Sequence, residues 1–372
     1  MLPPKIAEKL KQFKPYVPNE QICPVILNAG EHFYAPDTDY AAVLKDVQLN
    51  RYPDPRAEEV CRLAAAYFGV GGDTLPVAGN GSDELISLLC TALLPRGSRV
   101  LVAPPDFSMY EFYAATAELE LVTLPKTDSL QLDMDSFINA AQNVDTIFFS
   151  TPCNPTGQLV PPADIERLLT ATNALVVVDE AYMDFAGGSS AAGEESSMLR
   201  RIDKYSNLIV LRTCSKAFGL AGIRLGFAFA QSPITEALHA VRSPFNINAL
   251  TQAVGAAILS QPEKLHAMTQ AVQENKAKLE ARLSELFAKV AKTDDGAPGC
   301  ASPTKQGQEI YLVPALANFV LLRGTETKAI HGYLQEHGIA TRLLPPDLLR
   351  ITVGSETENG VLWQALCAYY NQ

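Results

Sequence analysis

Short runs of β-branched and other apolar residues recur through the middle of the chain and alternate with amphipathic segments. Five of these runs predict strands, at residues 98–104, 145–150, 174–180, 207–213 and 224–230. Most of them are continuously apolar, which is typical of strands that are covered on both faces. The pattern therefore predicts a mainly parallel sheet wrapped by helices, an α/β fold.

Two segments between the strands have helical periodicity. In residues 82–94 the apolar positions 85, 88, 89, 92 and 93 share one face, and Ser82 or Asp83 is placed to cap the helix. Residues 162–172 form a second candidate, with a proline near its start.

The pattern changes after residue 244. Residues 249–290 are rich in Ala, Leu, Lys and Glu and predict long helices that lead into a second domain. The polar, Gly- and Pro-containing segment 291–310 predicts a surface loop. The segments 317–323, 338–344 and 348–354 predict strands of a small α+β domain.

Composition and charge narrow the class of protein. The 372 residues include 47% hydrophobic and 19% charged residues, as in an ordinary folded protein, and the net charge of -11 disfavours binding to nucleic acid or to an anionic membrane. The seven cysteines form no CxxC pair and the five histidines have no ligand spacing, so we expect reduced thiols and no metal site. The amino-terminal residues lack the apolar core of a signal peptide, which favours the cytoplasm.

Polar side chains follow three of the predicted strands directly. Asn154 follows the run at 145–150, Asp179 and Tyr182 follow the apolar residues of 174–180, and Lys216 follows 207–213. The carboxyl ends of parallel strands meet at one edge of a sheet, where ligands bind. We therefore expect these four side chains to lie close together.

A lysine among apolar residues loses hydration, which favours the neutral, nucleophilic amine. Pyridoxal phosphate uses such an amine and needs a carboxylate beside its ring nitrogen and donors beside its ring oxygen. Asp179 can supply the carboxylate, since a buried anion needs a positive partner, and Asn154 and Tyr182 can supply the donors. Singly, these residues are common in turns and at strand ends, but their order along the chain favours a shared site.

The phosphate of such a cofactor also has candidate ligands. Residues 79–85, "GNGSDEL", form a glycine-rich turn at the start of a predicted helix, whose free amides attract an anion. Thr213 and Ser215 add hydroxyl groups, and Arg224 has the planar fork that binds two phosphate oxygens.

With these motifs in order, the chain resembles the fold-type I, aspartate-aminotransferase-like superfamily of pyridoxal-phosphate enzymes over nearly its whole length. The motifs are "CNPTG" (153–157), "VVVDEAY" (176–182) and "SKAFGLAGIRLG" (215–226). Through "RYPDP", "GNGSDE", "SMY", "ANFVLLR" and "LLRITVG" it is most similar to the histidinol-phosphate aminotransferases. The resemblance implies a large domain with a mainly parallel seven-stranded sheet at 46–245, a smaller α+β domain with its linking helix at 246–372, and a segment at 1–45 associated with that smaller domain.

The resemblance also implies a role for each site residue. Lys216 would hold the cofactor covalently and move the proton during transamination, while Asp179 keeps the ring electron-withdrawing. Asn154 and Tyr182 would face the ring oxygen, and Tyr110 would stack on the ring. The phosphate would be surrounded by Gly81, Ser82, Asp83, Thr213, Ser215 and Arg224, with Ser82 and Asp83 contributing mainly backbone amides.

Substrates and subunits follow from the same resemblance. Arg350 would bind the substrate carboxylate, Arg342 the phosphate of histidinol phosphate, and Asn28 would border the substrate. Tyr52 resembles a tyrosine that reaches the cofactor phosphate of the neighbouring subunit, which implies a homodimer with shared active sites. The expected reaction moves an amino group between histidinol phosphate and 2-oxoglutarate. Aromatic amino acids as substrates, or decarboxylation of threonine phosphate, are alternatives within the superfamily.

One segment departs from the family pattern. The usual "LNENPYGP" reads "LNAGEHFYAP" at 27–36, which keeps Asn28 and moves the acidic residue to Glu31, so the choice of substrate stays open. His32 lies in this segment, either at the surface or near the substrate.

The sequence fits two other classes of protein less well. A nicotinamide-dependent oxidoreductase needs GxGxxG before a helix, whereas "GLAGIRLG" precedes a predicted strand. A non-catalytic regulator needs an added DNA-binding segment, which the sequence does not offer.

Overall fold

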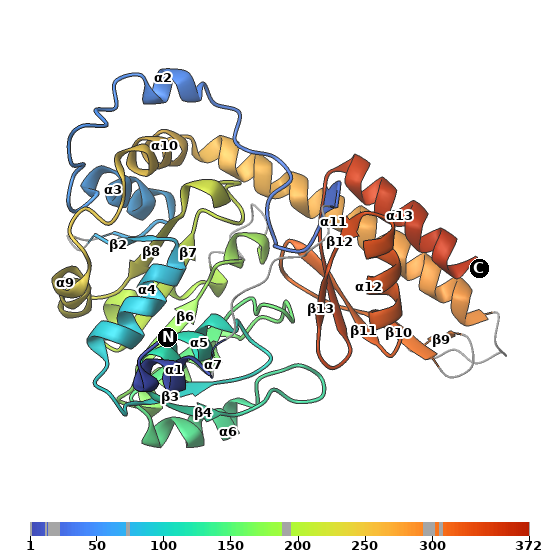
Figure 1. The fold of residues 1–372 in the computed structure, drawn as a ribbon, viewed down its shortest axis with the longest axis horizontal. Helices are drawn as coiled ribbons and strands as arrows, with labels where there is room; N and C mark the ends of the chain where they lie inside the picture. Colours follow the sequence, from blue (N-terminus) through green and yellow to red (C-terminus); the bar gives the residue numbers. More distant parts are fainter. Residues whose placement is uncertain are drawn as a thin grey trace.

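The computed structural model describes residues 2–11, 13, 23–71, 75–187, 195–292, 302–304 and 308–371. These residues form two larger sheets, each covered by helices, and a short two-stranded sheet. The long helix α11 (Pro262–Lys292) runs from the larger unit to the smaller one (Figure 1).

The larger sheet has seven strands in the order β2-β8-β7-β6-β5-β3-β4. Only β8 runs antiparallel to its neighbours, so the predicted fold class is confirmed. The five predicted strands are present, and two short strands at the sheet edges were not predicted. The bounds are β2 Val77–Asn80, β3 Arg99–Val102, β4 Glu120–Thr123, β5 Thr146–Ser150, β6 Leu175–Asp179, β7 Leu208–Thr213 and β8 Leu225–Phe229.

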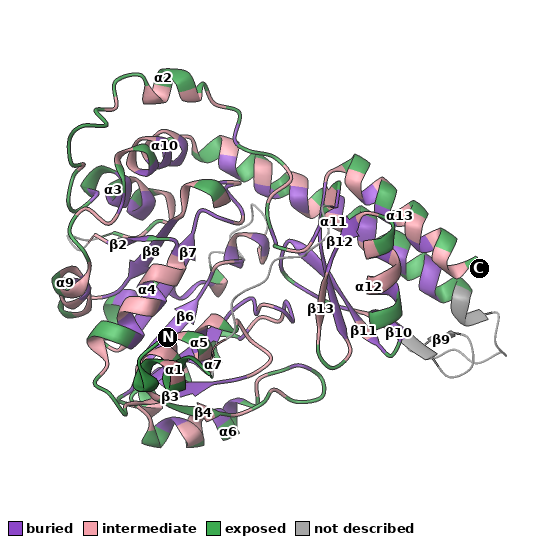
Figure 2. Cartoon of the chain, viewed as in Figure 1, coloured by how far each residue is buried: buried purple, intermediate pink, exposed green. Residues whose placement is uncertain are grey.

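Successive residues of the central strands belong to two different hydrophobic clusters, one on each face of the sheet. On β5, for example, Ile147 and Phe149 belong to one cluster and Phe148 to the other. Neighbouring side chains on a strand point to opposite faces. A sheet that is covered on both faces therefore needs the continuous apolar runs that the sequence shows, and Figure 2 shows these strands buried.

Helices cover both faces of this sheet. The α-helices are α3 Glu58–Tyr67, α4 Ser82–Leu88, α5 Met109–Thr116, α6 Met134–Ala140, α7 Pro162–Ala171, α9 Ser232–Val241 and α10 Ala249–Leu259. The short helices are η1 Leu89–Leu93, η2 Ala141–Asn143, η3 Met183–Phe185, η4 Met198–Lys204 and η5 Ala221–Ile223. The segment predicted as one helix at 82–94 is α4 followed by the π-helix η1.

The start of α4 differs from the predicted cap. The N-cap residue is Gly81, and neither Ser82 nor Asp83 makes a side-chain cap. Gly81 has φ +77°, a left-handed conformation that favours glycine. The side chain of Asp83 turns instead toward Arg224.

The smaller sheet has five antiparallel strands in the order β13-β14-β11-β10-β9, and α12 and α13 cover one face (Figure 1). Val320, Leu322 and Ile351 pack under these helices, whereas Leu321 and Leu348 lie on the other face. The bounds are β9 Ser302–Thr304, β10 Gln308–Val313, β11 Phe319–Gly324, β12 Ile339–Ala340, β13 Arg342–Leu344, β14 Leu348–Thr352, α12 Thr327–Glu336 and α13 Glu356–Tyr370.

The prediction of a single surface loop at 291–310 is wrong where the structure describes this segment. Helix α11 continues to Lys292, β9 spans Ser302–Thr304 and β10 begins at Gln308. The other residues of the segment lie outside the described residues.

The amino-terminal segment contacts both units. Strand β1 (Val25–Ile26) pairs with β12 of the smaller unit. Helix α1 (Pro4–Leu10) lies near the end of α5, where Lys9 Nζ is 2.8 Å from Glu118 Oε1, and α2 (Tyr40–Leu44) packs on α10. Helix α10 itself packs on α3. The predicted domain limits at 45 and 245 stay a prediction.

Three further observations concern the described residues alone. No helix among them is long and apolar enough to cross a membrane. No group of three or more His, Cys, Asp or Glu side chains in this part of the chain is arranged to hold a metal ion. The six cysteines within it are free thiols.

Candidate active site

The lysine, tyrosine, aspartate and asparagine predicted to form one site all lie at the carboxyl edge of β5, β6 and β7. Lys216 Nζ donates a 2.8 Å hydrogen bond to the carbonyl oxygen of Ala29 and lies 5.6 Å from the centre of the Tyr182 ring. A Cβ atom at Gly30 would be 2.9 Å from Tyr182 Oη and 3.3 Å from Lys216 Nζ. The divergent segment around Ala29 and Gly30 therefore passes directly beside the lysine.

Asp179 is a buried carboxylate at the end of β6. It accepts a 2.8 Å hydrogen bond from Tyr110 Oη and a 3.1 Å hydrogen bond from the Ala181 amide. Burial raises the pKa of Asp179 to about 7, although the hydrogen bonds from Tyr110 and Ala181 oppose this shift. Within the described part of the chain, no cationic side chain forms an ion pair with Asp179.

Tyr110 is fully buried beside this carboxylate. Its ring stacks on Phe148, with the ring centres 5.3 Å apart and the planes at 20°. Sequence reasoning did not foresee the hydrogen bond to Asp179, and the role expected for Tyr110 against a cofactor ring stays a prediction.

The residues predicted to surround a phosphate lie close to Arg224. Its guanidinium lies 3.1 Å from Asp83 Oδ2 and 3.3 Å from Ser215 Oγ. A Cβ atom at Gly81 would be 2.6 Å from Arg224 Nη2, so a side chain there would displace the guanidinium. Thr213 Oγ1 accepts a 3.1 Å hydrogen bond from the Ser215 amide. The predicted residues are thus close together, and the contact of Asp83 with Arg224 is made by its carboxylate.

Arg350 connects the smaller sheet to this edge. Its side chain is 8% exposed, donates a 2.7 Å hydrogen bond to the carbonyl oxygen of Asn28, and donates another to Asn154 Oδ1. Since Oδ1 of Asn154 is engaged, its amide nitrogen is left to donate elsewhere in the site.

Arg342 is the direct cross-strand partner of Arg350, on β13 and β14. Side chains directly opposite each other on antiparallel strands lie on the same face of the sheet, and two like charges so placed repel each other. The face of the smaller sheet that carries Arg350 therefore concentrates positive charge, which an anion would relieve.

Two asparagines near Arg350 and Gly30 have unused acceptors. The Oδ1 atoms of Asn28 and Asn318 are buried without a hydrogen-bond partner among the described residues. Asn318 Nδ2 donates a 3.0 Å hydrogen bond to the Gly30 carbonyl oxygen. Sequence reasoning singled out Asn28 and missed Asn318, whose only signal is its place in "ANFVLLR".

A buried cluster of charges behind the site was also missed. Arg212 lies 3.1 Å from Glu180 Oε2 and 2.8 Å from Asp184 Oδ1, and Ser197 Oγ donates a 2.6 Å hydrogen bond to Glu180. The available signal was the presence of charged residues within two apolar strand ends, "VVVDE" and "LIVLRT".

Two candidates lie outside this group of contacts. Tyr52 is 82% exposed and stacks on Phe245, with ring centres 4.5 Å apart. His32 uses both ring nitrogens within the chain, at 3.2 Å from the Met268 carbonyl oxygen and 2.9 Å from the Tyr34 amide. Burial lowers the pKa of His32 against the opposing effect of these two hydrogen bonds.

The fold and this edge of the sheet define a transferase of amino groups. The family model of the class I and II aminotransferases matches residues 15–366, and the chain belongs to this family. This membership contradicts the nicotinamide-dependent alternative, and β8 indeed follows "GLAGIRLG" where a dinucleotide site would need a helix.

Relatives with curated names are similar over almost the whole chain. The histidinol-phosphate aminotransferase of Clostridium kluyveri is 34% identical over 363 residues, which cover 95% of each chain. That of Thermococcus gammatolerans is 32% identical over 97% of this chain and 96% of its own length. The resemblance deduced from the motifs is therefore confirmed.

Solved structures share the fold at lower sequence identity. Histidinol-phosphate aminotransferase from Sinorhizobium meliloti, in complex with pyridoxal-5'-phosphate, has a TM-score of 0.80 at 22% identity and covers 97% of this chain and 96% of its own. L-threonine-O-3-phosphate decarboxylase from Porphyromonas gingivalis has a TM-score of 0.71 at 23% identity, covering 94% of this chain and 100% of its own. Since both identities are low, these similarities concern the fold alone.

Proposed function

We propose that this protein is a cytoplasmic, homodimeric aminotransferase that uses pyridoxal 5'-phosphate. It exchanges an amino group between histidinol phosphate, whose product is imidazole acetol phosphate, and 2-oxoglutarate, whose product is glutamate. The observation that carries the substrate assignment is the pairing of Arg342 with Arg350 on one sheet face, in a chain whose curated relatives are histidinol-phosphate aminotransferases.

The residues present fit the cofactor. Asp179 is buried without a cationic partner among the described residues, so the protonated ring nitrogen of pyridoxal phosphate would satisfy it. Arg224 and Ser215 present hydrogen-bond donors beside Gly81, whose φ of +77° favours glycine. Lys216 stands at the same edge with its amine within the site.

When bound, the cofactor supplies a carbonyl group for covalent attachment and a ring that withdraws electrons from the substrate. Lys216 Nζ provides the amine that holds it, and then accepts a proton from the substrate carbon and returns a proton during transfer. The Asp179 carboxylate holds the positive charge of the ring nitrogen. Tyr182 Oη and Asn154 Nδ2 would donate hydrogen bonds to the ring oxygen.

The arginines would orient both substrates. Histidinol phosphate and glutamate each carry an amine and an anionic group, a phosphate in one and carboxylates in the other. The planar fork of Arg350 binds two oxygens of either group. Arg342 on the neighbouring strand would add the charge that a phosphate dianion requires.

The cofactor assignment is tested by visible absorbance. We expect the purified protein, with added pyridoxal phosphate, to show an absorbance band that is absent from the Lys216→Ala variant, because the band requires the covalent bond to Nζ. A wild-type protein that stays colourless after addition of the cofactor would contradict the proposal.

The substrate assignment is tested by single-turnover reactions that follow this band. Histidinol phosphate should react faster than phenylalanine or threonine phosphate, and Arg342→Ala should slow phosphorylated substrates more than unphosphorylated ones. Faster reaction of phenylalanine would favour an aromatic aminotransferase, and release of CO₂ from threonine phosphate would favour a decarboxylase.

The dimer is supported by the exposure of Tyr52, which contacts Phe245 and none of the site residues described above. In the proposed dimer its hydroxyl reaches the cofactor phosphate of the partner subunit. Mixing a Lys216→Ala chain with a Tyr52→Ala chain should restore activity, because one of the two sites in a mixed dimer then carries both native residues. A protein that sediments as a monomer while fully active would contradict this arrangement.

A further inference from the structure

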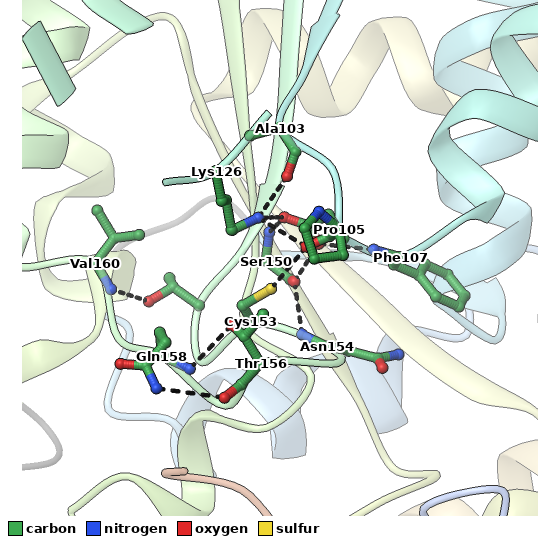
Figure 3. A network of polar contacts seen from close by, with 12 residues as sticks. Ala103, Pro105, Phe107, Lys126, Ser150, Cys153, Asn154, Thr156, Gln158 and Val160 are labelled. Atoms are coloured by element: carbon green, nitrogen blue, oxygen red, sulfur yellow. Dashed lines mark hydrogen bonds and ion pairs between the residues drawn. The ribbon is translucent and has the colours of Figure 1, made fainter. Parts of the chain in front are cut away.

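A buried polar network lies beneath Asn154, at the carboxyl ends of β3, β4 and β5. Its centre is an ion pair between Lys126 and Asp106, with Nζ 3.0 Å from Oδ2, and each side chain is only 4% exposed. Figure 3 shows Lys126, Ser150 and Asn154 gathered around the same point. The pair therefore does not meet solvent or substrate.

Both charges of this pair are fully engaged with protein groups. Lys126 Nζ donates to the carbonyl oxygens of Ala103, at 2.5 Å, and Pro105, at 3.0 Å, besides Asp106 (Figure 3). Asp106 accepts hydrogen bonds from the Phe107 amide, at 2.7 Å, and from both the amide and the hydroxyl group of Ser150. Such complete satisfaction fixes the geometry of the two loops that carry the pair.

Ser150 connects this ion pair to the active site. Its hydroxyl group donates to Asp106 and accepts a 3.0 Å hydrogen bond from the Asn154 amide (Figure 3). The side chain of Asn154 in turn accepts from Arg350. A continuous chain of hydrogen bonds thus connects a buried ion pair to the arginine that faces the substrate.

We propose that Asp106, Lys126 and Ser150 are positioning residues, which hold the backbone of Asn154. The side-chain amide oxygen of Asn154 then orients Arg350 for the anionic group of the substrate. This inference rests on the proposed function. Burying two charges costs hydration, and an apolar pair would often be at least as stable. The hydrogen-bond connection to Asn154 gives the ion pair a positioning role, whereas a purely stabilising role does not require two buried charges.

Ser150→Ala is the informative change, because it removes the acceptor of the Asn154 amide and leaves the ion pair in place. We expect the KM for 2-oxoglutarate to rise about tenfold with kcat within about twofold, because misplacing a positioning group weakens substrate orientation. The affinity of the cofactor-loaded enzyme for 2-oxoglutarate, measured by calorimetry, should fall by a similar factor. The visible absorbance band should still be present, because Lys216 still attaches the cofactor.

Thr235→Val is the matched control. Thr235 is also buried, and its hydroxyl group donates a hydrogen bond to the Ser232 carbonyl oxygen on α9 but has no connection to Asn154. It should lower thermal stability as Ser150→Ala does and leave KM unchanged. Equal KM values in wild type and Ser150→Ala, or equal rises in both variants, would overturn the inference.

A double variant, Asp106→Asn with Lys126→Met, tests the ion pair without leaving one charge buried alone. It should fold, and its affinity for 2-oxoglutarate should also fall about tenfold; wild-type affinity would overturn the role of the pair. A wild-type enzyme that binds 2-oxoglutarate but transfers no amino group would contradict the proposed function, and the affinity comparison would still decide this inference. A wild type with no affinity for 2-oxoglutarate would overturn both.

Discussion

Asp179 places a titratable group with a perturbed pKa at the centre of the site. Its pKa is raised from 3.8 to about 7, mainly by burial, so the folded state prefers the protonated form. Protonated Asp179 therefore stabilises the folded protein fully below about pH 4, the pKa of an unfolded aspartate, and this stabilisation is lost as the pH rises toward 7. The pKa difference between the folded and unfolded states corresponds to a change in the free energy of unfolding on the order of 4 kcal/mol.

We therefore expect the thermal midpoint of the cofactor-depleted protein to decrease as the pH is raised from about 4 to about 7. The Asp179→Asn variant should show a flatter profile, because its side chain does not titrate. Parallel profiles for the two proteins would show that Asp179 does not carry this pH dependence. Adding the cofactor to the wild type should restore most stability at the upper end of the range, where the carboxylate is charged.

The sequence predicts those site residues that directly follow an apolar strand. Lys216, Asp179 and Asn154 each follow an apolar strand, and parallel strands bring such positions together. It did not predict Asp106 with Lys126, because their partnership depends on two loops that meet only when the sheet has formed. For the same reason, the hydrogen bond between Tyr110 and Asp179 could not be foreseen.

At the scale of elements, the buried cluster of Arg212, Glu180 and Asp184 ties the end of β7 to the turn after β6. Arg212→Met should destabilise the protein by about 3–5 kcal/mol, because it leaves two carboxylates buried without their cationic partner. Urea unfolding measures this loss. As a control, Arg99→Gln removes a partner from an exposed ion pair with Glu120 and should cost less than about 1 kcal/mol. Similar losses in both variants would contradict the assignment.

Element prediction succeeded where burial imposed a clear pattern. The five central strands lie in continuous apolar runs, whereas β2 and β4 lie at the sheet edges, where β2 contains a glycine and an asparagine and β4 is mostly exposed. Edge strands of this kind leave little signal in sequence. The capping prediction at Ser82 failed because the conformation of Gly81 and the attraction of Asp83 to Arg224 determine how α4 begins.

At the scale of the whole molecule, the loop after β5 packs against the segment before β11. Gly157 has φ +69°, its carbonyl oxygen accepts a 2.7 Å hydrogen bond from the Leu316 amide, and a Cβ atom there would overlap Ala315. The periodic pattern predicted both sheets but carries no information about such a close approach between them. This contact holds Asn154, on the same loop, beside the smaller sheet.

Gly157→Ala should therefore destabilise the protein and also raise the KM for 2-oxoglutarate. The backbone conformation alone should cost about 1–2 kcal/mol, and overpacking against Ala315 should add about 1–3 kcal/mol. Gly97→Ala is the control, since Gly97 has φ +79° but no atom near the added Cβ. The control should show only the backbone cost and an unchanged KM. Equal urea midpoints for the two variants would contradict the packing argument.

The division of the site between two sheets has a consequence for how such an enzyme can change. The lysine proposed to perform the chemistry is carried by the larger sheet, whereas the two arginines proposed to bind the substrate are carried by adjacent strands of the smaller one. Substitutions along β13 and β14 can thus alter which acid or phosphate is accepted while the reacting lysine stays untouched. We therefore expect substitutions on these two strands to change the choice of substrate more than the rate of the chemical step.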